Sequence, residues 1–452
     1  MHATNLKSTG RFRHRKATAP SEQRPTDLSQ LRRLLDPAAN VALPIRPQGA
    51  GTASTDCNIS TAGTTLKMTG LNRVVHIDSD KNLVTAQAGV RLESLVKELK
   101  EYGLELVGCY DLQGRTVGGA VSAPCFGPCI GNDGSFFSSH VVAMKIIRVD
   151  GQLMKIESHQ ENLLNTFRMS YGALGVVYEA TFRVRPIRTF SASHRRVSID
   201  AFASAVDALA NGDVGFKFYL MPHRDRVYLD LRRYEAEPGH SYAAPWKLKD
   251  WGESTVLPQV FKLLNKVVPI ASVRYRLMDS ISEATQSLVN SRLVNTGTNA
   301  ALQANCHQST GRRNIFYSTW CFPASNFSMV VRAYRDFCES TFARSRYRCD
   351  LPAQGYRLGK DTSSLLSPSF DDPMIALTTA STQARGWDDF VIDLAEFAES
   401  WAGTPTFSQS RALRGDYAQQ TYANRLEFFR RMRQRLDPEN RFLSPFLAQY
   451  CQ

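Results

Sequence analysis

Short apolar runs alternate with glycine-rich segments through the first part of the chain. The apolar runs predict strands at 41–45, 74–78, 83–88, 141–149 and 176–184. The polar turn at 79–82 makes the second and third of these a hairpin. Apolar positions at helical spacing predict a helix over 92–99, which Gly103 ends, and a shorter one at 162–169. We therefore expect strands and helices to be interleaved as far as Pro186.

The pattern changes after Pro186. Longer alternating runs predict strands at 214–221, 227–232 and 314–322, interspersed with helices at 326–343 and 388–401. This order is typical of an α+β domain with a mainly antiparallel sheet. Near the end, Tyr422, Leu426, Phe429 and Leu436 form one apolar helical stripe that stops at Asp437-Pro438. Because 452 residues exceed one ordinary core, we expect two packed domains.

Composition indicates a soluble globular protein, with 43% hydrophobic and 21% charged residues. No apolar run reaches the roughly 18 residues that a membrane helix needs, so no stable membrane span is predicted. The nine cysteines are scattered, which is typical of free thiols in a reducing compartment and favours the cytoplasm. Cys125 and Cys129 are the only close pair, and without a second pair or spaced histidines we expect no metal site.

The net charge of +13 is concentrated partly at the N-terminus. Six basic residues face the single acid Glu22 between Lys7 and Arg24. We interpret residues 1–28 as a basic flexible tail, with an organelle-targeting segment as the alternative. The remaining basic residues are scattered and match no nucleic-acid-binding motif, so we expect no nucleic-acid partner.

Three glycine-rich loops, at 49–51, 118–119 and 172–175, lie in the first part of the chain. Backbone N–H groups in such loops can hold a pyrophosphate without a charged side chain. The loops match neither the Gly-x-Gly-x-x-Gly dinucleotide pattern nor the Gly-Lys-Ser/Thr phosphate loop. Taken singly, each is more typical of an ordinary turn, whereas together they suggest one elongated ligand.

Six segments in order resemble one known family. They are Arg46-Pro47-Gln48-Gly49-Ala50-Gly51, the hairpin 71–89, Asp111 with Thr116-Val117-Gly118-Gly119-Ala120, 138–142, 171–177, and Leu436-Asp437-Pro438 with Arg441-Phe442. They resemble the FAD-binding oxidoreductases of the vanillyl-alcohol oxidase and p-cresol methylhydroxylase (PCMH) type. Within that type the resemblance is to the D-arabinono-1,4-lactone (aldonolactone) oxidase branch.

The resemblance implies an α+β protein with a two-subdomain FAD-binding domain of PCMH type and an α+β cap domain built on a mainly antiparallel sheet. It implies an FAD-binding domain at 29–187, a substrate-binding cap at 188–405 and a C-terminal segment at 406–452 that returns to the FAD domain. The positions that match the cofactor segments are Arg46, Pro47, Gln48, Gly49, Ala50, Gly51, Thr52, Ala53, Asp111, Thr116, Val117, Gly118, Gly119, Ser122, Gly127, Ser138, Val141, Gly172, Gly175, Val176 and Val177.

The chain departs from the family at the positions that attach FAD. Many relatives carry a histidine where this chain has Thr52, and a loop histidine where it has Phe126. A hydroxyl does not readily replace the histidine, so we expect non-covalent FAD. Cys109 and Cys125 lie close enough to the second attachment position to leave that link open.

The cap departs as well. Thr319 stands where aldonolactone oxidases usually have a glutamate, and Thr406-Phe407-Ser408-Gln409 replaces their His-Trp-Gly-Lys stretch. Gln409 can hydrogen-bond a substrate but cannot act as an ionised base. We take Gln409 and Tyr317 as the catalytic candidates. Weaker candidates for polar contacts are His307, Arg312 and Arg313, and Arg357 and Lys360 for an anionic substrate.

The resemblance implies an FAD-dependent oxidoreductase acting on a CH–OH or similar donor. It would take a hydride from a small polar substrate to flavin N5, with O2 or another compound as electron acceptor. The lost cap residues favour a sugar-like or specialised-metabolite intermediate of biosynthesis over a standard aldonolactone. Two alternatives stay open: a flavin-binding protein with lost or altered chemistry, and a basic binding module without cofactor. The oligomeric state is also open.

Overall fold

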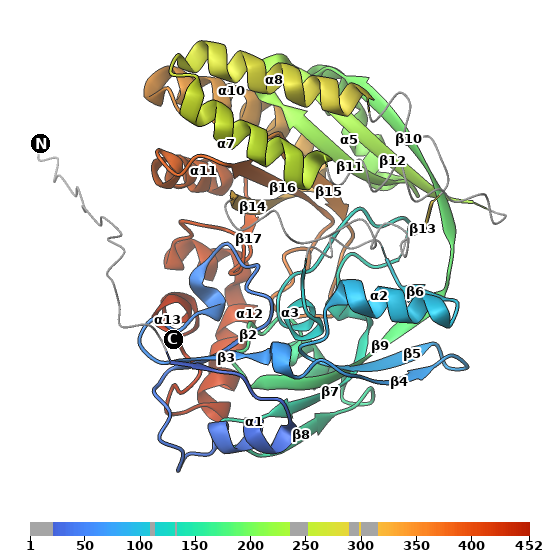
Figure 1. The fold of residues 1–452 in the computed structure, drawn as a ribbon, viewed down its shortest axis with the longest axis vertical. Coiled ribbons are helices and arrows are strands. Elements are labelled where there is room, and N and C mark those ends of the chain that lie inside the picture. Colours follow the sequence, from blue (N-terminus) through green and yellow to red (C-terminus); the bar gives the residue numbers. More distant parts are fainter. Residues whose placement is uncertain (1–20, 109–113, 132, 236–251, 289–297, 300–314) are drawn as a thin grey trace, which may run out of the picture.

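The computed structural model describes residues 21–108, 114–131, 133–235, 252–288, 298–299 and 315–452. Figure 1 places the elements of the first part of the chain at one end of the molecule and the helices α5, α7, α8 and α10 at the other end, whereas α12 and α13 lie beside β2 and β3. We call the region from β10 to β17 the cap. The α+β class with an antiparallel cap sheet, predicted from the order of the elements, is confirmed.

A small parallel sheet begins the chain, in the order β1 (Ser21–Gln23), β3 (Thr64–Lys67), β2 (Ile45–Gln48). The strand predicted at 41–45 is wrong in position, because the residues that pair with β3 are Ile45 to Gln48. β2 lies at the edge of this sheet, where a proline such as Pro47 is tolerated. Of the predicted tail, residues 1–20 lie outside the described part, whereas Ser21–Gln23 pair with β3 and Leu28 begins α1 (Leu28–Leu35).

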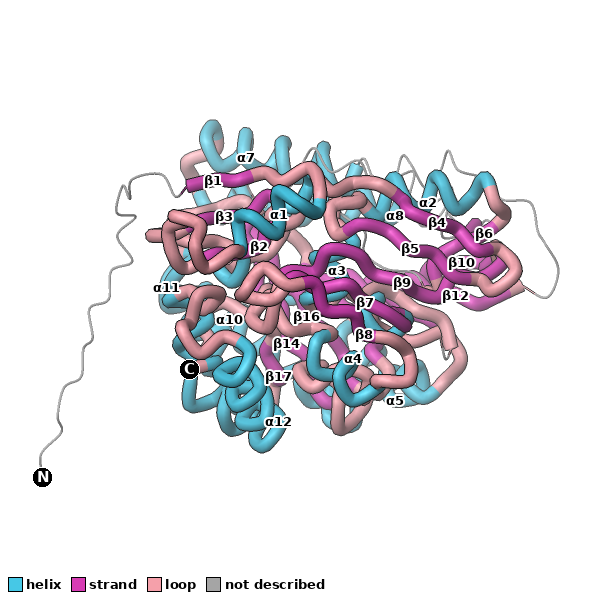
Figure 2. The backbone as a smooth tube through the Cα atoms, turned by 90° about the horizontal axis from the view of Figure 1, so that it is seen from below, coloured by secondary structure: helices cyan, strands magenta, loops and turns pink. Residues whose placement is uncertain are grey.

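A second sheet carries the predicted hairpin. Its order is β4 (Val74–Asp78), β5 (Leu83–Gln87), β9 (Val176–Pro186), β7 (Val141–Ile147), β8 (Leu153–Ile156), and β6 (Leu104–Leu106) pairs with β9. Figure 2 shows these strands side by side. The helices of this region are α2 (Leu92–Glu101), α3 (Val117–Ser122) and α4 (Glu161–Phe167). The hairpin and the α2 helix agree with their predicted positions, since Leu92, Leu95, Val96 and Leu99 are all buried.

The cap is built on one antiparallel sheet. Its order is β13 (Thr298–Asn299), β10 (Thr189–Val197), β12 (Arg226–Tyr234), β11 (Gly215–Met221), β15 (Ala353–Leu358), β16 (Met374–Ser381), β14 (Phe316–Pro323), β17 (Thr404–Pro405). Its helices are α5 (Ile199–Asn211), α7 (Leu257–Val267), α8 (Ala271–Leu288), α10 (Phe327–Ser345) and α11 (Trp387–Ser400). All of the helices and strands predicted for this region are present, with ends shifted by a few residues.

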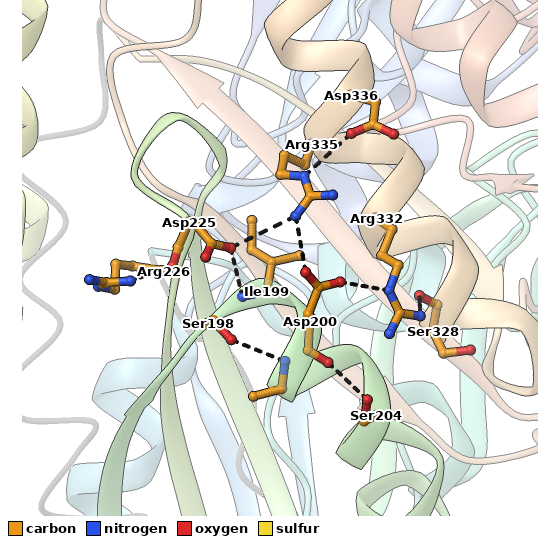
Figure 3. Close-up of polar contacts among 11 residues, drawn as sticks. Ser198, Ile199, Asp200, Ser204, Asp225, Arg226, Ser328, Arg332, Arg335 and Asp336 are labelled. Carbon is orange, nitrogen blue, oxygen red and sulfur yellow. Dashed lines mark hydrogen bonds and ion pairs between the residues drawn. The ribbon is translucent and has the colours of Figure 1, made fainter.

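Polar contacts join two cap helices. Arg332 and Arg335 of α10 both reach Asp200 of α5, at 2.8 and 3.5 Å (Figure 3). Ser198 caps α5 by accepting a hydrogen bond from Ala201 N. Asp200 is exposed, so we regard these pairs as fixing the orientation of the helices rather than as a large source of stability.

The end of the chain returns to the first part. α12 (Gly415–Leu436) buries Tyr422, Leu426 and Phe429, as the apolar stripe predicts, and ends before Asp437. α13 (Pro445–Cys451) follows it. The backbone of Arg441 accepts a hydrogen bond from Ile45 N at 2.7 Å, which ties the C-terminus to β2. Among the residues that the structure describes, no helix is both long and apolar enough to cross a bilayer.

Candidate active site

A cavity with about 810 Å³ of empty volume lies between the first part of the chain and the cap. On one side its wall comes from the loop after β2, from α3 and from the turn before β9. On the other side Tyr317 of β14 and the turn with Ser408 and Gln409 face it. All three glycine-rich loops identified in the sequence therefore reach one cavity.

The loops reach the cavity together because glycine lets them approach one another. A Cβ on Gly49 would lie 2.1 Å from Thr116 Oγ1, the side chain that caps α3. A Cβ on Gly172 would lie 2.6 Å from Pro47 Cγ, and Gly172 also has a φ of +67°. A side chain at either position would push two loops of the wall apart.

Most of the predicted cofactor contacts line this cavity. They are Pro47, Gly49, Ala50, Gly51, Thr52, Ala53, Thr116, Gly118, Gly119, Ser122, Gly172, Gly175 and Val177. The others do not line it: Arg46, Gln48, Val117, Gly127, Ser138, Val141 and Val176. Asp111 lies outside the described residues.

The cavity also has lining residues that the sequence did not single out. They are Cys57, Asn58, Met68, Ala88, Arg115, Ala123, Tyr171 and Ser408. Arg115, Tyr171 and Ser408 are each adjacent to a predicted contact, so a wider reading of the same motifs includes them. Ala88 lies in the family-like segment 71–89. Cys57, Asn58 and Met68 carry no local signal, because only the packing of distant segments brings them to the wall.

Arg46 lies behind the wall instead of in it. Its side chain is fully buried and donates five hydrogen bonds to the backbone carbonyls of Cys57, Tyr171, Gly172 and Phe442. Burial lowers the pKa of Arg46 to about 10, which still leaves the guanidinium charged at neutral pH. Arg46 therefore joins two loops of the wall to the C-terminal segment.

The turn that carries Gln409 is fixed on both sides. Ser410 N donates to Thr406 O at 2.9 Å, which closes the turn. Ser54 N and Ser54 Oγ donate to the carbonyls of Ser408 and Gln409, both at 3.0 Å. Thr319 N of β14 donates to the Gln409 carbonyl at 3.1 Å. The turn is thus bound to the loop after β2 and to the cap sheet at once.

The side chain of Gln409 is buried, and it shares a hydrogen-bond acceptor with Arg115. Gln409 Nε2 donates to Pro124 O at 3.3 Å, and Arg115 Nη1 donates to the same oxygen at 2.8 Å. Tyr317 reaches across the cavity entrance from the cap, since its hydroxyl donates to the Thr52 carbonyl. These contacts join the two predicted catalytic residues to the loops of the first part of the chain.

Ionisable groups are few on this wall. Arg115 is the only charged side chain among the described lining residues, which include no carboxylate, lysine or histidine. Burial raises the pKa of the Cys57 thiol to about 11 and raises the pKa of Tyr171 well above its ordinary value. At neutral pH the described wall therefore holds one cation, Arg115, together with a protonated thiol and a protonated phenol.

The other candidates lie elsewhere. Arg357 donates to Gly212 O at 2.6 Å and Lys360 is exposed, and neither lines the cavity. Thr319 is buried and its hydroxyl contacts that of Thr378 at 2.8 Å. His307, Arg312, Arg313 and Cys109 lie outside the described residues.

Comparison with known proteins identifies the family. A model of the FAD-binding domain matches residues 23–157, and a model of D-arabinono-1,4-lactone oxidase matches residues 180–450, more than half of the chain. The chain belongs to the D-arabinono-1,4-lactone oxidase family. It carries an FAD-binding domain, so FAD is its cofactor, and the family predicted from the six segments is confirmed. The alternative of a module without cofactor is thereby excluded.

Relatives of this family member are about a quarter identical over the roughly half of the chain that they match. L-gulono-1,4-lactone dehydrogenase of Mycobacterium tuberculosis is 27% identical over 48% of this chain and 49% of its own. The mitochondrial L-galactono-1,4-lactone dehydrogenase of Arabidopsis thaliana is 25% identical over 58% of this chain and 42% of its own. The chain thus spans about half the length of the curated relatives it matches.

A solved structure confirms the fold. Cholesterol oxidase from B. sterolicum superposes with a TM-score of 0.78 over 95% of this chain and 94% of its own, at 14% identity. At that identity the likeness concerns the fold alone.

The cavity of this family member fits FAD on its own features. The glycine loops expose backbone to the cavity instead of side chains, as a close-fitting pyrophosphate requires. Ser408 Oγ is buried in the wall and has no hydrogen-bond partner in the described part of the chain. A buried hydroxyl without a partner costs free energy that a polar ligand can recover.

Proposed function

We propose that this family member is an FAD-dependent oxidoreductase, an oxidase or a dehydrogenase, that removes a hydride from a CH–OH group of a small sugar-like lactone. One observation carries the proposal: the glycine loops, Tyr317 of the cap and Gln409 of the C-terminal segment line the same cavity. Cofactor and substrate can therefore meet in one cavity. The relatives named as lactone dehydrogenases support the substrate class.

The FAD side of the cavity is mainly backbone. The N–H groups of 49–51 and those of Gly172 and Gly175 would hold the pyrophosphate and neighbouring polar atoms, and Ser408 Oγ would offer a further hydrogen bond. The N–H groups of 117–119 already donate within the protein, so α3 contributes close packing at the wall instead. When bound, FAD supplies the hydride acceptor. We assign 29–187 to the FAD-binding domain, 188–405 to the substrate-binding cap and 406–452 to the returning segment. The second sheet, the cap sheet and the Ile45–Arg441 contact support this division, while β1, which precedes residue 29, also pairs with the first sheet.

Substrate contacts fall to Gln409 and Arg115. Because both donate to Pro124 O, they meet at one point of the wall. The Gln409 amide would orient a substrate hydroxyl but take up no proton. The Arg115 guanidinium would stabilise negative charge on the substrate oxygen as its proton leaves to water. Tyr317 acts as a positioning residue, since its hydroxyl holds the loop that carries Thr52.

A second candidate function follows from the same wall. A lactone hydroxyl must lose a proton during oxidation, and the described lining offers no carboxylate or histidine to accept it. A cavity lining without a proton acceptor favours an alternative: a member of the family that catalyses a different reaction, or one that binds flavin without turnover.

Anaerobic mixing with lactones tests the proposal. We expect L-gulono-, L-galactono- or D-arabinono-1,4-lactone to bleach the flavin absorbance of the purified holoprotein. Arg115→Met is expected to slow bleaching by about 10²-fold with FAD content unchanged, the usual cost of losing one charge-stabilising donor. Arg357→Met is the matched control, because Arg357 does not line the cavity, and its rate should equal that of the wild type.

The outcomes separate the two candidates. Bleaching by dithionite but by no lactone would support the altered chemistry and reject the lactone oxidoreductase. Reoxidation when air is admitted would identify O2 as the acceptor, whereas reoxidation only by an added dye or cytochrome would identify a dehydrogenase.

FAD is expected to be bound without a covalent link. Thr52 is exposed on the loop where the resemblance implies an attaching histidine, and Cys57, a buried thiol that lines the cavity, is protonated at neutral pH because of its raised pKa. Acid precipitation should leave the yellow flavin absorbance in the supernatant. Flavin in the pellet would identify a covalent link and refute the Thr52 argument.

For the compartment, we propose the cytoplasm. Cys57, Cys321, Cys338, Cys349 and Cys451 form no disulfide within the described part of the chain, as in a reducing environment. Cell fractionation with an antibody to the full chain tests this, and recovery of the protein inside an organelle would instead favour targeting by the basic N-terminal residues.

A further inference from the structure

The helical hairpin α7–α8 exposes a concentration of large apolar side chains. Leu263 and Val267 of α7, Ile270 of the turn, and Val273 and Leu277 of α8 are each 43% to 60% exposed. They account for five of the eleven large apolar side chains that are exposed in the described residues. Figure 1 shows α7 and α8 side by side on the cap, at the end of the molecule away from α1 and β8. We call these five residues the hairpin patch.

The two helices pack against the cap through the sides that do not carry the hairpin patch. The inner sides of the two helices already bury Leu257, Phe261, Tyr275 and Met278, which pack with Phe342 and Leu351. Asn265 also donates to Asp350 Oδ2 at 3.0 Å, which ties α7 to the cap. The hairpin is thus packed against the cap by one side. Residues four positions apart lie on the same face of a helix, so Leu263 and Val267 share an exposed face of α7, and Val273 and Leu277 share one of α8. A packed helical hairpin that leaves five large apolar side chains exposed is the kind of surface that marks an interaction site.

The charges around the hairpin patch are positive. Lys262, Lys266 and Arg276 flank its members and form no ion pair within the described part of the chain. The acids on α8 are already neutralised: Asp279 contacts Arg348 at 2.5 Å and Arg224 at 3.4 Å, and Glu283 lies 3.9 Å from Arg224. The partner of this surface must therefore accept apolar side chains and present negative charge.

From this pairing we propose that the α7–α8 hairpin docks the protein on an anionic lipid bilayer. The apolar side chains enter the headgroup boundary and Lys262, Lys266 and Arg276 face the lipid phosphates, as in other amphipathic surfaces that lie on a membrane. A second copy of the chain fits less well, because a two-fold contact through this face would bring its cations against each other. None of the five hairpin-patch residues lines the cavity.

Vesicle flotation of the FAD-loaded full chain tests the proposal. We expect binding to vesicles of phosphatidylcholine with 30% phosphatidylglycerol to be at least 10-fold stronger than to pure phosphatidylcholine, and to weaken with added salt. The double variant Leu263→Gln/Val273→Gln and the double variant Lys266→Glu/Arg276→Glu should each reduce that binding at least 10-fold. Ile392→Gln on α11 is the control, because Ile392 is also 50% exposed, and its binding should not change.

Unfolding cannot account for the expected result, since flavin absorbance and thermal unfolding of each variant are measured in parallel. Vesicle binding that persists in both double variants would assign it to another surface, such as the basic N-terminus, and overturn the proposal. A dimer in sedimentation that the Leu263→Gln/Val273→Gln variant dissociates, with no vesicle binding, would overturn it in favour of a second copy.

Discussion

Replacing Arg46 by methionine is expected to destabilise the folded chain by about 3 kcal/mol or more, the usual cost of removing a buried charge from its hydrogen-bonding partners. The four carbonyls that it serves come from segments far apart in the sequence, at Cys57, Tyr171, Gly172 and Phe442. Methionine fills similar volume but leaves all four without their donor. Urea unfolding of the apoprotein measures the change directly.

Two further variants give this result its meaning. Arg46→Lys keeps the charge, but a single ammonium cannot reach four carbonyls, so we expect an intermediate loss. Arg431→Met is the control, since the Arg431 side chain is 72% exposed and its pair with Glu427 contributes little. If Arg46→Met unfolded at the wild-type urea concentration yet lost FAD, Arg46 would be a cofactor contact, as the motif implies, and the bracing role would be wrong.

Local patterns predicted the elements whose neighbours in sequence are also their neighbours in space. The hairpin β4–β5 is the clearest case, because alternation and a polar turn determine its pairing without help from the rest of the chain. The same holds for α2, whose four leucine and valine positions face the core. β2 was misplaced because its ends are decided by β3, some twenty residues away, rather than by its own apolar run.

The sequence predicted the residues of the cavity wall that belong to a motif, but not those that reach the wall only through packing of distant segments. Gly49, Thr116 and Gly172 occur in recognisable segments and line the cavity. Arg46 belongs to the same motif as Gly49, yet alternation along the strand turns its side chain to the other side, where the carbonyls lie. Met68 and Cys57 reach the wall only through the folding of β3 and the 3-10 turn at Asp56–Asn58, which no motif records.

In the cap, the position at which the family resemblance implies a catalytic residue does not contribute to the cavity. Thr319 is the position at which the resemblance implies a glutamate, but its hydroxyl is buried against Thr378 and does not line the cavity. The charge that the described wall does carry belongs to Arg115, which comes from the first part of the chain. If the enzyme oxidises a lactone, the charged side chain that stabilises the substrate oxygen comes from the loop before α3 instead of from the cap. Arg115→Met is therefore the informative variant.

Replacing Gly172 by alanine is expected to weaken FAD binding at least 10-fold, equivalent to about 1.4 kcal/mol. Two costs act together at this position. A φ of +67° disfavours any residue with a Cβ by roughly 1–2 kcal/mol. In addition, the new Cβ would lie 2.6 Å from Pro47 Cγ, so the turn before β9 and the loop after β2 must separate at the cavity wall. Fluorescence titration of the apoprotein with FAD measures the dissociation constant.

Gly103→Ala separates the two costs. Gly103 has nearly the same φ, +70°, but a Cβ there would meet no atom within 4 Å. It should therefore lower the thermal unfolding temperature by an amount comparable to the strain at Gly172 and leave the FAD dissociation constant unchanged. A loss of FAD affinity in Gly172→Ala alone would assign the effect to the contact between the loops. Equal affinities in both variants would mean that FAD does not depend on how closely these loops approach, and the pyrophosphate role of the turn at Gly172 would have to be abandoned.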